Sequence, residues 1–300
     1  MAIAAVSDLL ATMTDHAKGR LMTTLGILFI VPDSLFIRLV DADTLTIAFW
    51  RNLSAGVTGT LGLVLLTRGR TVEAVRATGW QGVVYSIGSC AGGIMFVAAV
   101  KLTSVANVVF ILASMPMFAA LYSWLALGER IGRRMLLTML VVAAGVAIIA
   151  YGSGGNEQTS IWGDLIALSL AAMFAGILTV ARTKREVPMA PAVPFSFLGA
   201  ALLLAPFSDI WSVPDGQYWI VIMHGGVFIA MAMTLMSIGP QYITSAEVAL
   251  LVLLETVLAP LLVWGFLGEN PGSWTLLGGA VVLGALLISN LVVLMRRSTG

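Results

Sequence analysis

Apolar stretches of about twenty residues recur along the whole chain, separated by short polar turns. A helix of that length can cross the hydrocarbon core of a bilayer, which is about 30 Å thick. The chain is 59% hydrophobic and 10% charged, whereas soluble domains carry about 25% charged residues. A fold in water would have too little polar surface to cover itself. We therefore expect an all-α polytopic membrane protein that has the lipid bilayer as its surroundings.

Turn-forming residues such as those in "SVPDGQ" and "GENPGS" divide the apolar sequence into ten predicted transmembrane helices. The predicted spans cover residues 21–40, 44–67, 79–100, 103–127, 132–152, 161–181, 192–211, 216–238, 243–267 and 273–295. No linker or low-complexity block indicates a separate soluble domain.

Lysine and arginine predict the orientation, because cytoplasmic loops of membrane proteins are enriched in both. Thirteen of the sixteen lie in the N-terminal segment, in the loops after spans 2, 4 and 6, or in the C-terminal tail. The exceptions are Arg38, Arg51 and Lys101, which fall within or near the other ends of spans. We therefore expect a multi-pass protein of the inner (plasma) membrane with both termini in the cytoplasm.

Two segments that join one predicted span to the next, here called corners, are similar in sequence and lie 140 residues apart: "WLALGERIGRR" (124–134) and "WGFLGENPGSW" (264–274). An ungapped alignment of 101–150 with 241–290 gives fourteen identities in fifty positions. A repeat of five spans, an odd number, must enter the membrane upside down the second time, which explains why only the first corner carries arginines. Inverted repeats are typical of secondary transporters, which bind substrate near the midplane between the halves.

The repeat divides the chain into an N-terminal cytoplasmic segment (1–18), a first five-helix repeat (19–152) and a second five-helix repeat (153–300), which together form one membrane domain.

With its two "LGE" corners, the chain resembles the drug/metabolite transporter superfamily and, within it, the bacterial EamA-type family. The stretches that carry the resemblance are "ASMPMFAALYSWLALGERI" (113–131) and "LLETVLAPLLVWGFLGENP" (253–271). The resemblance implies a central cavity surrounded by helices 1–4 and 6–9, with helices 5 and 10 peripheral. It also implies an exporter of amino acids, similar to the aromatic amino acid exporters. One departure is Thr256, which stands where the first copy has Pro116, so we do not expect symmetrical kinks in helices 4 and 9.

Ionisable residues within a span are costly and therefore mark candidate functional positions. Asp33 and Arg51 lie about 10 Å below the outer ends of helices 1 and 2, at 1.5 Å per residue. Matching depth on adjacent helices predicts an ion pair, with either a structural or a gating role.

His224 and Glu255 are predicted to lie level with each other near the midplane, on helices 8 and 9. Such a pair could bind the ammonium group of an amino acid or carry a proton. The alternative is a hydrogen-bonded pair that holds the two helices together. The repeat places Met115 at the position equivalent to Glu255, so one pocket would have an apolar and an acidic wall.

Apolar and aromatic side chains on helices expected to line the cavity complete the predicted substrate site. These are Tyr85, Phe110, Phe228 and Met231.

Several function classes lack the residues they need. The sequence has no GxxxxGK[ST] phosphate loop, no GxSxG motif and no metal-ligand cluster, so we expect no cofactor, no bound metal and no enzymatic activity. A net charge of +1 makes nucleic acid an unsuitable partner. We expect a monomeric secondary transporter that exports small metabolites, chiefly aromatic or other neutral amino acids. The alternative is an exporter of lipophilic cations that binds them at a membrane-embedded acid.

Overall fold

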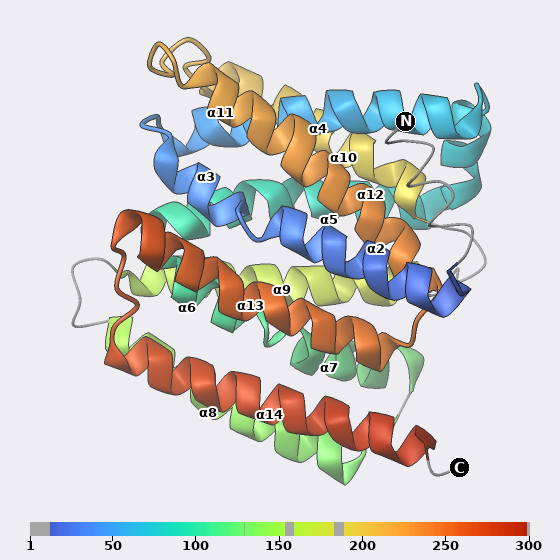
Figure 1. Cartoon of the computed structure of the whole chain (residues 1–300), viewed down its shortest axis with the longest axis vertical. Coiled ribbons are helices and arrows are strands. Elements are labelled where there is room, and N and C mark those ends of the chain that lie inside the picture. The colour runs from blue at the N-terminus through green and yellow to red at the C-terminus, as the bar shows by residue number, and fades with distance from the viewer. Residues whose placement is uncertain (1–12, 129, 154–158, 183–188, 299–300) are drawn as a thin grey trace.

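The computed structural model describes residues 13–128, 130–153, 159–182 and 189–298, and in these ranges the regular structure is helical (Figure 1). Nine helical segments among the described residues are long and apolar enough to cross a membrane. The predicted N-terminal segment, 1–18, lies mostly outside the described residues.

In chain order the longer helices are α2 (Asp15–Ile30), α3 (Asp33–Leu39), α4 (Thr44–Thr67), α5 (Thr71–Leu102), α6 (Val105–Leu112), α7 (Met115–Leu127), α8 (Arg133–Ser153), α9 (Ile161–Arg182), α10 (Val193–Leu204), α11 (Tyr218–Met223), the π-helical turn η3 (His224–Ile229), α12 (Ala230–Ile238), α13 (Ser245–Leu267) and α14 (Ser273–Ser298). The 3-10 turns are η1 (Ala190–Ala192), η2 (Ala205–Phe207) and η4 (Gly239–Gln241).

Helix α4 is the predicted second span and the one that does not belong to the nine. It has 24 residues, and its bounds match the prediction of 44–67. Its sequence includes Arg51 and Asn52 and several threonines, all of which lower its mean hydropathy. The nine apolar segments together with α4 correspond to the ten predicted spans.

Three predicted spans are interrupted near mid-membrane depth. The first is divided into α2 and α3 at Val31–Pro32, because proline cannot supply the N–H that would continue the α2 ladder. The fourth is divided into α6 and α7 at Ala113–Ser114, just before Pro116. The eighth contains the π-helical turn η3, a feature that is frequent at functional sites. Helix α13 instead continues through Pro260, so helices 4 and 9 are asymmetric as predicted.

The two repeats share their helix-terminus chemistry. Ser104 accepts the backbone N–H of Asn107 at the start of α6, and Thr244 accepts that of Glu247 at the start of α13. Gly128 ends α7 at φ 67° and ψ 15°, and Gly268 ends α13 at φ 68° and ψ 13°. In both cases glycine is suited to the left-handed conformation that stops the helix. These equivalent helices run in opposite directions, since the end of α13 lies beside the start of α6.

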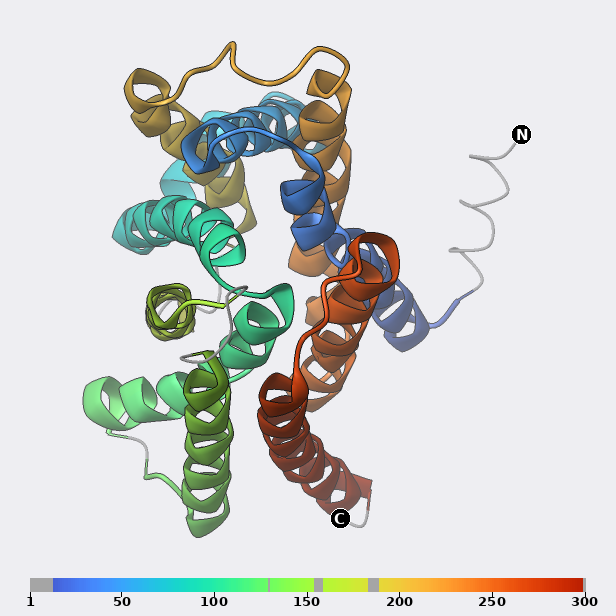
Figure 2. The same ribbon diagram turned by 90° about the vertical axis from the view of Figure 1, so that its left-hand side faces the viewer.

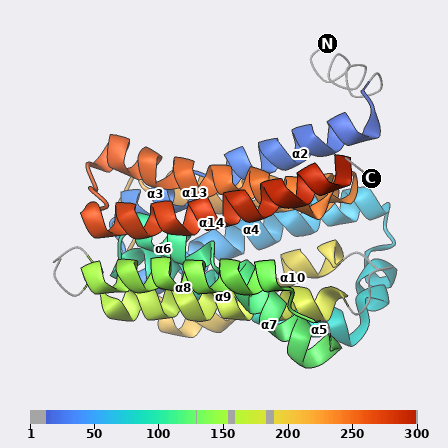
Figure 3. The same ribbon diagram turned by 90° about the horizontal axis from the view of Figure 1, so that it is seen from below.

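The bundle has two chemically different ends, which Figure 3 shows at right and left. We call the end with the α4–α5 turn and the end of α7 the basic end, and the opposite end, which faces the viewer in Figure 2, the acidic end. The basic end carries Arg68, Arg70, Arg133 and Arg134. The acidic end carries Asp41, Asp43, Asp209 and Asp215.

The basic residues outside the basic end each have a partner at the acidic end or in the core. Arg38 donates to the Thr103 carbonyl (2.8 Å), and Lys101 donates to the Val40 carbonyl (3.3 Å). Arg51 belongs to the site described below. The three exceptions to the predicted charge pattern therefore each have a polar partner within the bundle.

Small residues allow close helix packing at the edge of the bundle. Helices α8 and α14, the predicted peripheral helices 5 and 10, pack together in Figure 1. A Cβ on Gly278 would overlap the Gly145 carbonyl, and one on Gly145 would overlap Val282. Substituting either glycine would push the two helices apart.

Candidate functional site

Asp33 is the centre of a buried charged triad. It is the first residue of α3, directly after the break at Pro32, and is 4% exposed. Arg51 of α4 binds it in a bidentate manner, with Nε 2.9 Å from Oδ1 and Nη2 2.6 Å from Oδ2. His224 Nε2 lies 2.5 Å from the same Oδ1. The ion pair expected from sequence is present, and histidine is an added partner.

The predicted pairing of His224 with Glu255 is wrong, because the histidine contacts Asp33 instead. The local backbone explains the difference. Gly225, which follows His224, packs against α4 so closely that a Cβ would overlap the Arg51 carbonyl and the Ser54 hydroxyl. This approach, together with the π-helical turn, turns His224 toward α3 and α4.

An aromatic cluster covers one side of the triad. The ring of Phe36 stacks on His224 at a centroid distance of 5.2 Å. Phe228 lies 4.8 Å from Phe36 and 5.8 Å from Phe29, again between centroids. All three phenylalanines are only partly buried, so their rings present apolar surface next to the buried charges. The structure thus brings the predicted Phe228 to the triad, and adds Phe29 and Phe36.

Glu255 is an acid without a bonded partner. Among the described residues, its carboxylate has no hydrogen bond or ion pair, and the side chain is partly exposed. It lies close enough to Asp33 for the two negative charges to act on each other. On α13 it flanks the stripe of Thr256, Ala259 and Val263, which is buried. Glu255 is therefore free to bind a positively charged group.

The remaining predicted site residues occupy different surroundings. Met115 is the first residue of α7 and is partly buried just after the break in helix 4. Phe110 is buried in the core, and its ring packs on Gly279 of α14. Tyr85 interacts with Ser89 on its own helix, and lies about 15 Å nearer the basic end than the triad, at 1.5 Å per residue. Met231 is 42% exposed, on a stripe with Met223 and Val227 that faces away from buried Ile229.

A second polar network, at the acidic end, has no counterpart in the sequence predictions. Asp164 of α9 accepts hydrogen bonds from Thr103 (2.8 Å), Asn107 (3.0 Å) and Ser153 (2.5 Å). Thr275 of α14 donates to Asn107 (2.6 Å). These side chains are 5% exposed or less. This network is hard to recognise from sequence, because an acidic residue such as Asp164 is common in the first turn of a helix.

Two glutamates near the ends of α13 make contacts with the other repeat. Glu269 accepts the N–H of Val105 at the start of α6 (2.7 Å) and pairs with Arg38 (3.1 Å). Glu247 accepts a hydrogen bond from Arg20 (2.6 Å) and forms a capping box with Thr244. The equivalent corner residue of the first repeat, Glu129, lies outside the described residues.

An open cavity of about 710 Å³ lies at the acidic end, beside the contacting rings of Tyr151 and Trp274. It is bordered by the peripheral α8 and α14, whereas the triad is formed by α3, α4 and η3. We therefore treat the triad, its aromatic cluster and Glu255 as the candidate site.

Comparison with known proteins finds relatives that are named transporters, one of which matches most of the chain. An uncharacterized transporter of Archaeoglobus fulgidus is 28% identical over 256 residues, which cover 85% of this chain and 90% of that protein. The uncharacterized transporter YdfC of Bacillus subtilis is 24% identical over 185 residues, 59% of this chain and 60% of YdfC. A solved crystal structure superimposes with a TM-score of 0.64 at 19% identity, covering 93% of this chain and 97% of its own, and so shares the fold.

The family model for EamA-like transporters matches the chain twice, at residues 18–151 and 161–291. One match falls in each predicted repeat. With its helical bundle, its paired repeats and these two matches, the chain belongs to the EamA-like transporter family.

Proposed function

We propose that this small-molecule transporter exports amino acids with aromatic or other neutral side chains, by alternating access around the candidate site. The observation that carries the proposal is the position of Glu255, an unbonded carboxylate near a triad that already satisfies Asp33. With a neutral His224 the triad sums to zero charge, so Glu255 supplies the net charge of the site. A negative site of this kind favours a substrate with a positive group.

The geometry supports recognition of both parts of such a substrate. Glu255 would bind the ammonium group, a charge-assisted contact worth about 1.5–3 kcal/mol. The partly exposed rings of Phe29, Phe36 and Phe228 would pack against the side chain. An aromatic substrate would gain additional edge-to-face contacts with these rings.

A transport assay tests the substrate class. Purified protein in liposomes would be given radiolabelled neutral amino acids and, separately, a fluorescent quaternary ammonium dye. We expect uptake of aromatic amino acids above that of smaller ones. Transport of the dye without any amino acid would favour the alternative, a lipophilic cation exporter in which Glu255 is the binding acid. Transport of neither would contradict both.

Met115→Trp should block transport while leaving the protein folded. Met115 is equivalent to Glu255 in the repeat and follows the break between α6 and α7, so a larger ring there would fill space at the site. Met115→Leu, which keeps the side-chain volume, serves as the control and should transport normally. Unchanged transport by Met115→Trp would place the substrate elsewhere.

We also propose that the basic end faces the cytoplasm and the protein lies in the inner (plasma) membrane. In a Cys90→Ala background, Asn270→Cys at the acidic end should react with a membrane-impermeant thiol reagent added outside intact cells. Arg70→Cys at the basic end should react only after the cells are opened. Both positions are exposed. Labelling of residue 70 from outside would reverse the proposed orientation.

A further inference from the structure

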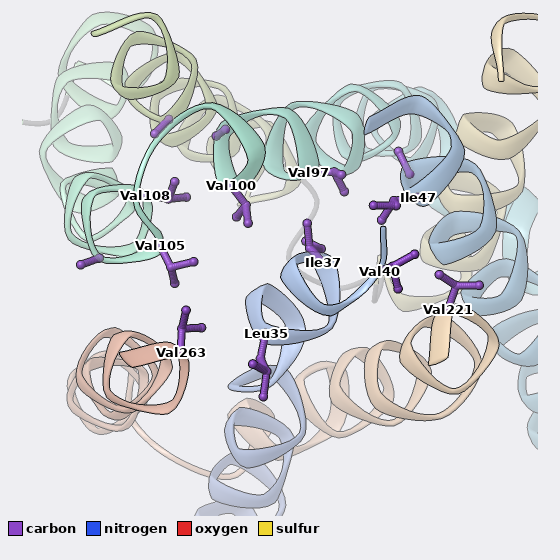
Figure 4. Close-up of a cluster of buried hydrophobic side chains, with 14 of the residues drawn as sticks. Leu35, Ile37, Val40, Ile47, Val97, Val100, Val105, Val108, Val221 and Val263 are labelled. Atoms are coloured by element: carbon purple, nitrogen blue, oxygen red, sulfur yellow. The ribbon is translucent and has the colours of Figure 1, made fainter. Parts of the chain in front are cut away.

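The packing of the bundle differs between its two ends. The largest buried apolar cluster, part of which appears in Figure 4, lies in the half of the bundle nearer the acidic end. Many of its members come from the end of α3, the start of α4, the end of α5, the start of α6 and the end of α13, and others come from α8, α9, α10 and α11. Examples are Ile37, Ile47, Val100, Val105 and Val263. The other two apolar clusters of the described residues are small and lie nearer the middle.

Polar contacts between the two repeats add to the apolar packing near the acidic end. Arg38 of the first repeat pairs with Glu269 of the second, and Glu269 also accepts the N–H of Val105. Beside them, Asn107 of the first repeat donates to Asp164 of the second. We call Arg38, Glu269, Asn107 and Asp164 the acidic-end lattice. Its four members link α3, α6 and α9 to the corner after α13.

Contacts at the basic end are of a different kind. Glu247 binds Arg20 and His16, but the Arg20 side chain is 60% exposed and that of His16 is 50% exposed. A contact between exposed charges contributes little to stability, typically below about 1 kcal/mol. Asn107 and Asp164 are 0% and 4% exposed, where each unpaired polar atom would be costly.

Sequence equivalence relates the two ends. Glu247 stands at the position of the second repeat that corresponds to Asn107 in the first. Each residue belongs to the first turn of its helix and contacts the first helix of the opposite repeat, α2 for Glu247 and α9 for Asn107. The contact with the first helix of the opposite repeat is therefore buried at the acidic end, where Asn107 makes it, and exposed to solvent at the basic end, where Glu247 makes it.

We propose that the acidic-end lattice is a gate, closed in this structure, whose dissociation opens the site toward the acidic end. The inference rests on the proposed transport function and adds the residues that control access from one side. In the closed form the apolar cluster and the polar contacts separate the site from the acidic end. Release at the acidic end requires the bonds of Asp164 and Glu269 to break and the apolar cluster to separate.

Thiol accessibility tests the gate. Leu35, a member of the apolar cluster that is 8% exposed and labelled in Figure 4, would be changed to Cys in a Cys90→Ala background. An impermeant thiol reagent would be applied at the acidic end in sealed vesicles of known orientation. Asp164→Asn keeps the side-chain size but loses acceptors for its three donors, so it should raise the labelling rate about tenfold or more. Glu269→Gln should do the same.

Glu247→Gln is the matched control, because it removes the equivalent contact at the basic end and should leave labelling at the acidic end unchanged. Thermal melting of each variant identifies any that is unfolded. If Asp164→Asn does not fold, the labelling rate of Glu269→Gln tests the gate, because Glu269 is less buried than Asp164. The proposal fails if folded Asp164→Asn and Glu269→Gln label at the parent rate, or if Glu247→Gln labels as fast as they do. The readout needs no substrate, so a wrong substrate class would not be mistaken for a wrong gate.

Discussion

Asp33→Asn should destabilise the protein by about 3–5 kcal/mol, the cost of removing one partner from a buried ion pair. Arg51 is 4% exposed, and both of its contacts with Asp33 depend on the carboxylate charge. The Nη1 atom of Arg51 is already buried without a hydrogen bond, and among the described residues Asp33 is the one carboxylate within ion-pair distance of the guanidinium. His224 would keep an amide oxygen as partner, which limits the loss to the ion pair.

The double variant Asp33→Asn with Arg51→Gln should be more stable than Asp33→Asn alone, since it leaves no charge buried without a partner. The coupling between Asp33 and Arg51 is measured by thermal melting of the parent protein, Asp33→Asn, Arg51→Gln and the double variant in one detergent. Additive losses would mean that the two residues contribute independently, which the bidentate geometry does not allow.

Glu255→Gln should lower the transport efficiency for amino acids by about ten- to a hundredfold, the equivalent of a charge-assisted contact of about 1.5–3 kcal/mol. The same change should leave stability unchanged or slightly higher. Glu255 has no hydrogen bond to lose among the described residues, and its charge repels that of Asp33. Initial transport rates and melting curves of the same preparations give both quantities.

The two readouts separate binding from scaffolding at this residue. If Glu255 has a structural role, Glu255→Gln should lose stability and transport together. If Glu255 binds substrate, the variant should lose transport alone. Glu255→Asp keeps the charge and should retain most of the activity. If Glu255→Gln transports normally from about pH 5.5 to 8, the range in which a histidine or a buried carboxyl titrates, Glu255 neither binds substrate nor carries a proton.

The sequence predicts the fold well because a bilayer allows few structures. Helices must satisfy their own backbone groups, so apolar length locates them, and α4 matches its predicted bounds even with Arg51 inside it. The breaks are harder to predict. Pro32 interrupts its helix whereas Pro260 does not, because neighbouring packing decides whether a proline bends a helix or ends it.

Contacts within the site are only partly predictable, because helix depth gives one coordinate and helix rotation is also needed. Depth sufficed for Asp33 and Arg51, which lie on consecutive helices. It failed for His224, whose rotation follows from the π-helical turn and from the close approach of Gly225 to α4. The Asp164 network also escaped prediction, since its members lie at the end of α5 and on α6, α8, α9 and α14, and their contacts depend on how these helices pack.

The break between α6 and α7 has no equivalent in α13, and this difference has a consequence for the alternating-access cycle proposed above. A discontinuous helix can bend by changing a few backbone dihedrals, whereas a continuous helix moves as one unit. In such a cycle the two repeats would move differently, so the two access states would not be mirror images of equal free energy. The state of lower free energy would then predominate without substrate, and the substrate affinities measured from the two faces would differ even without a driving gradient.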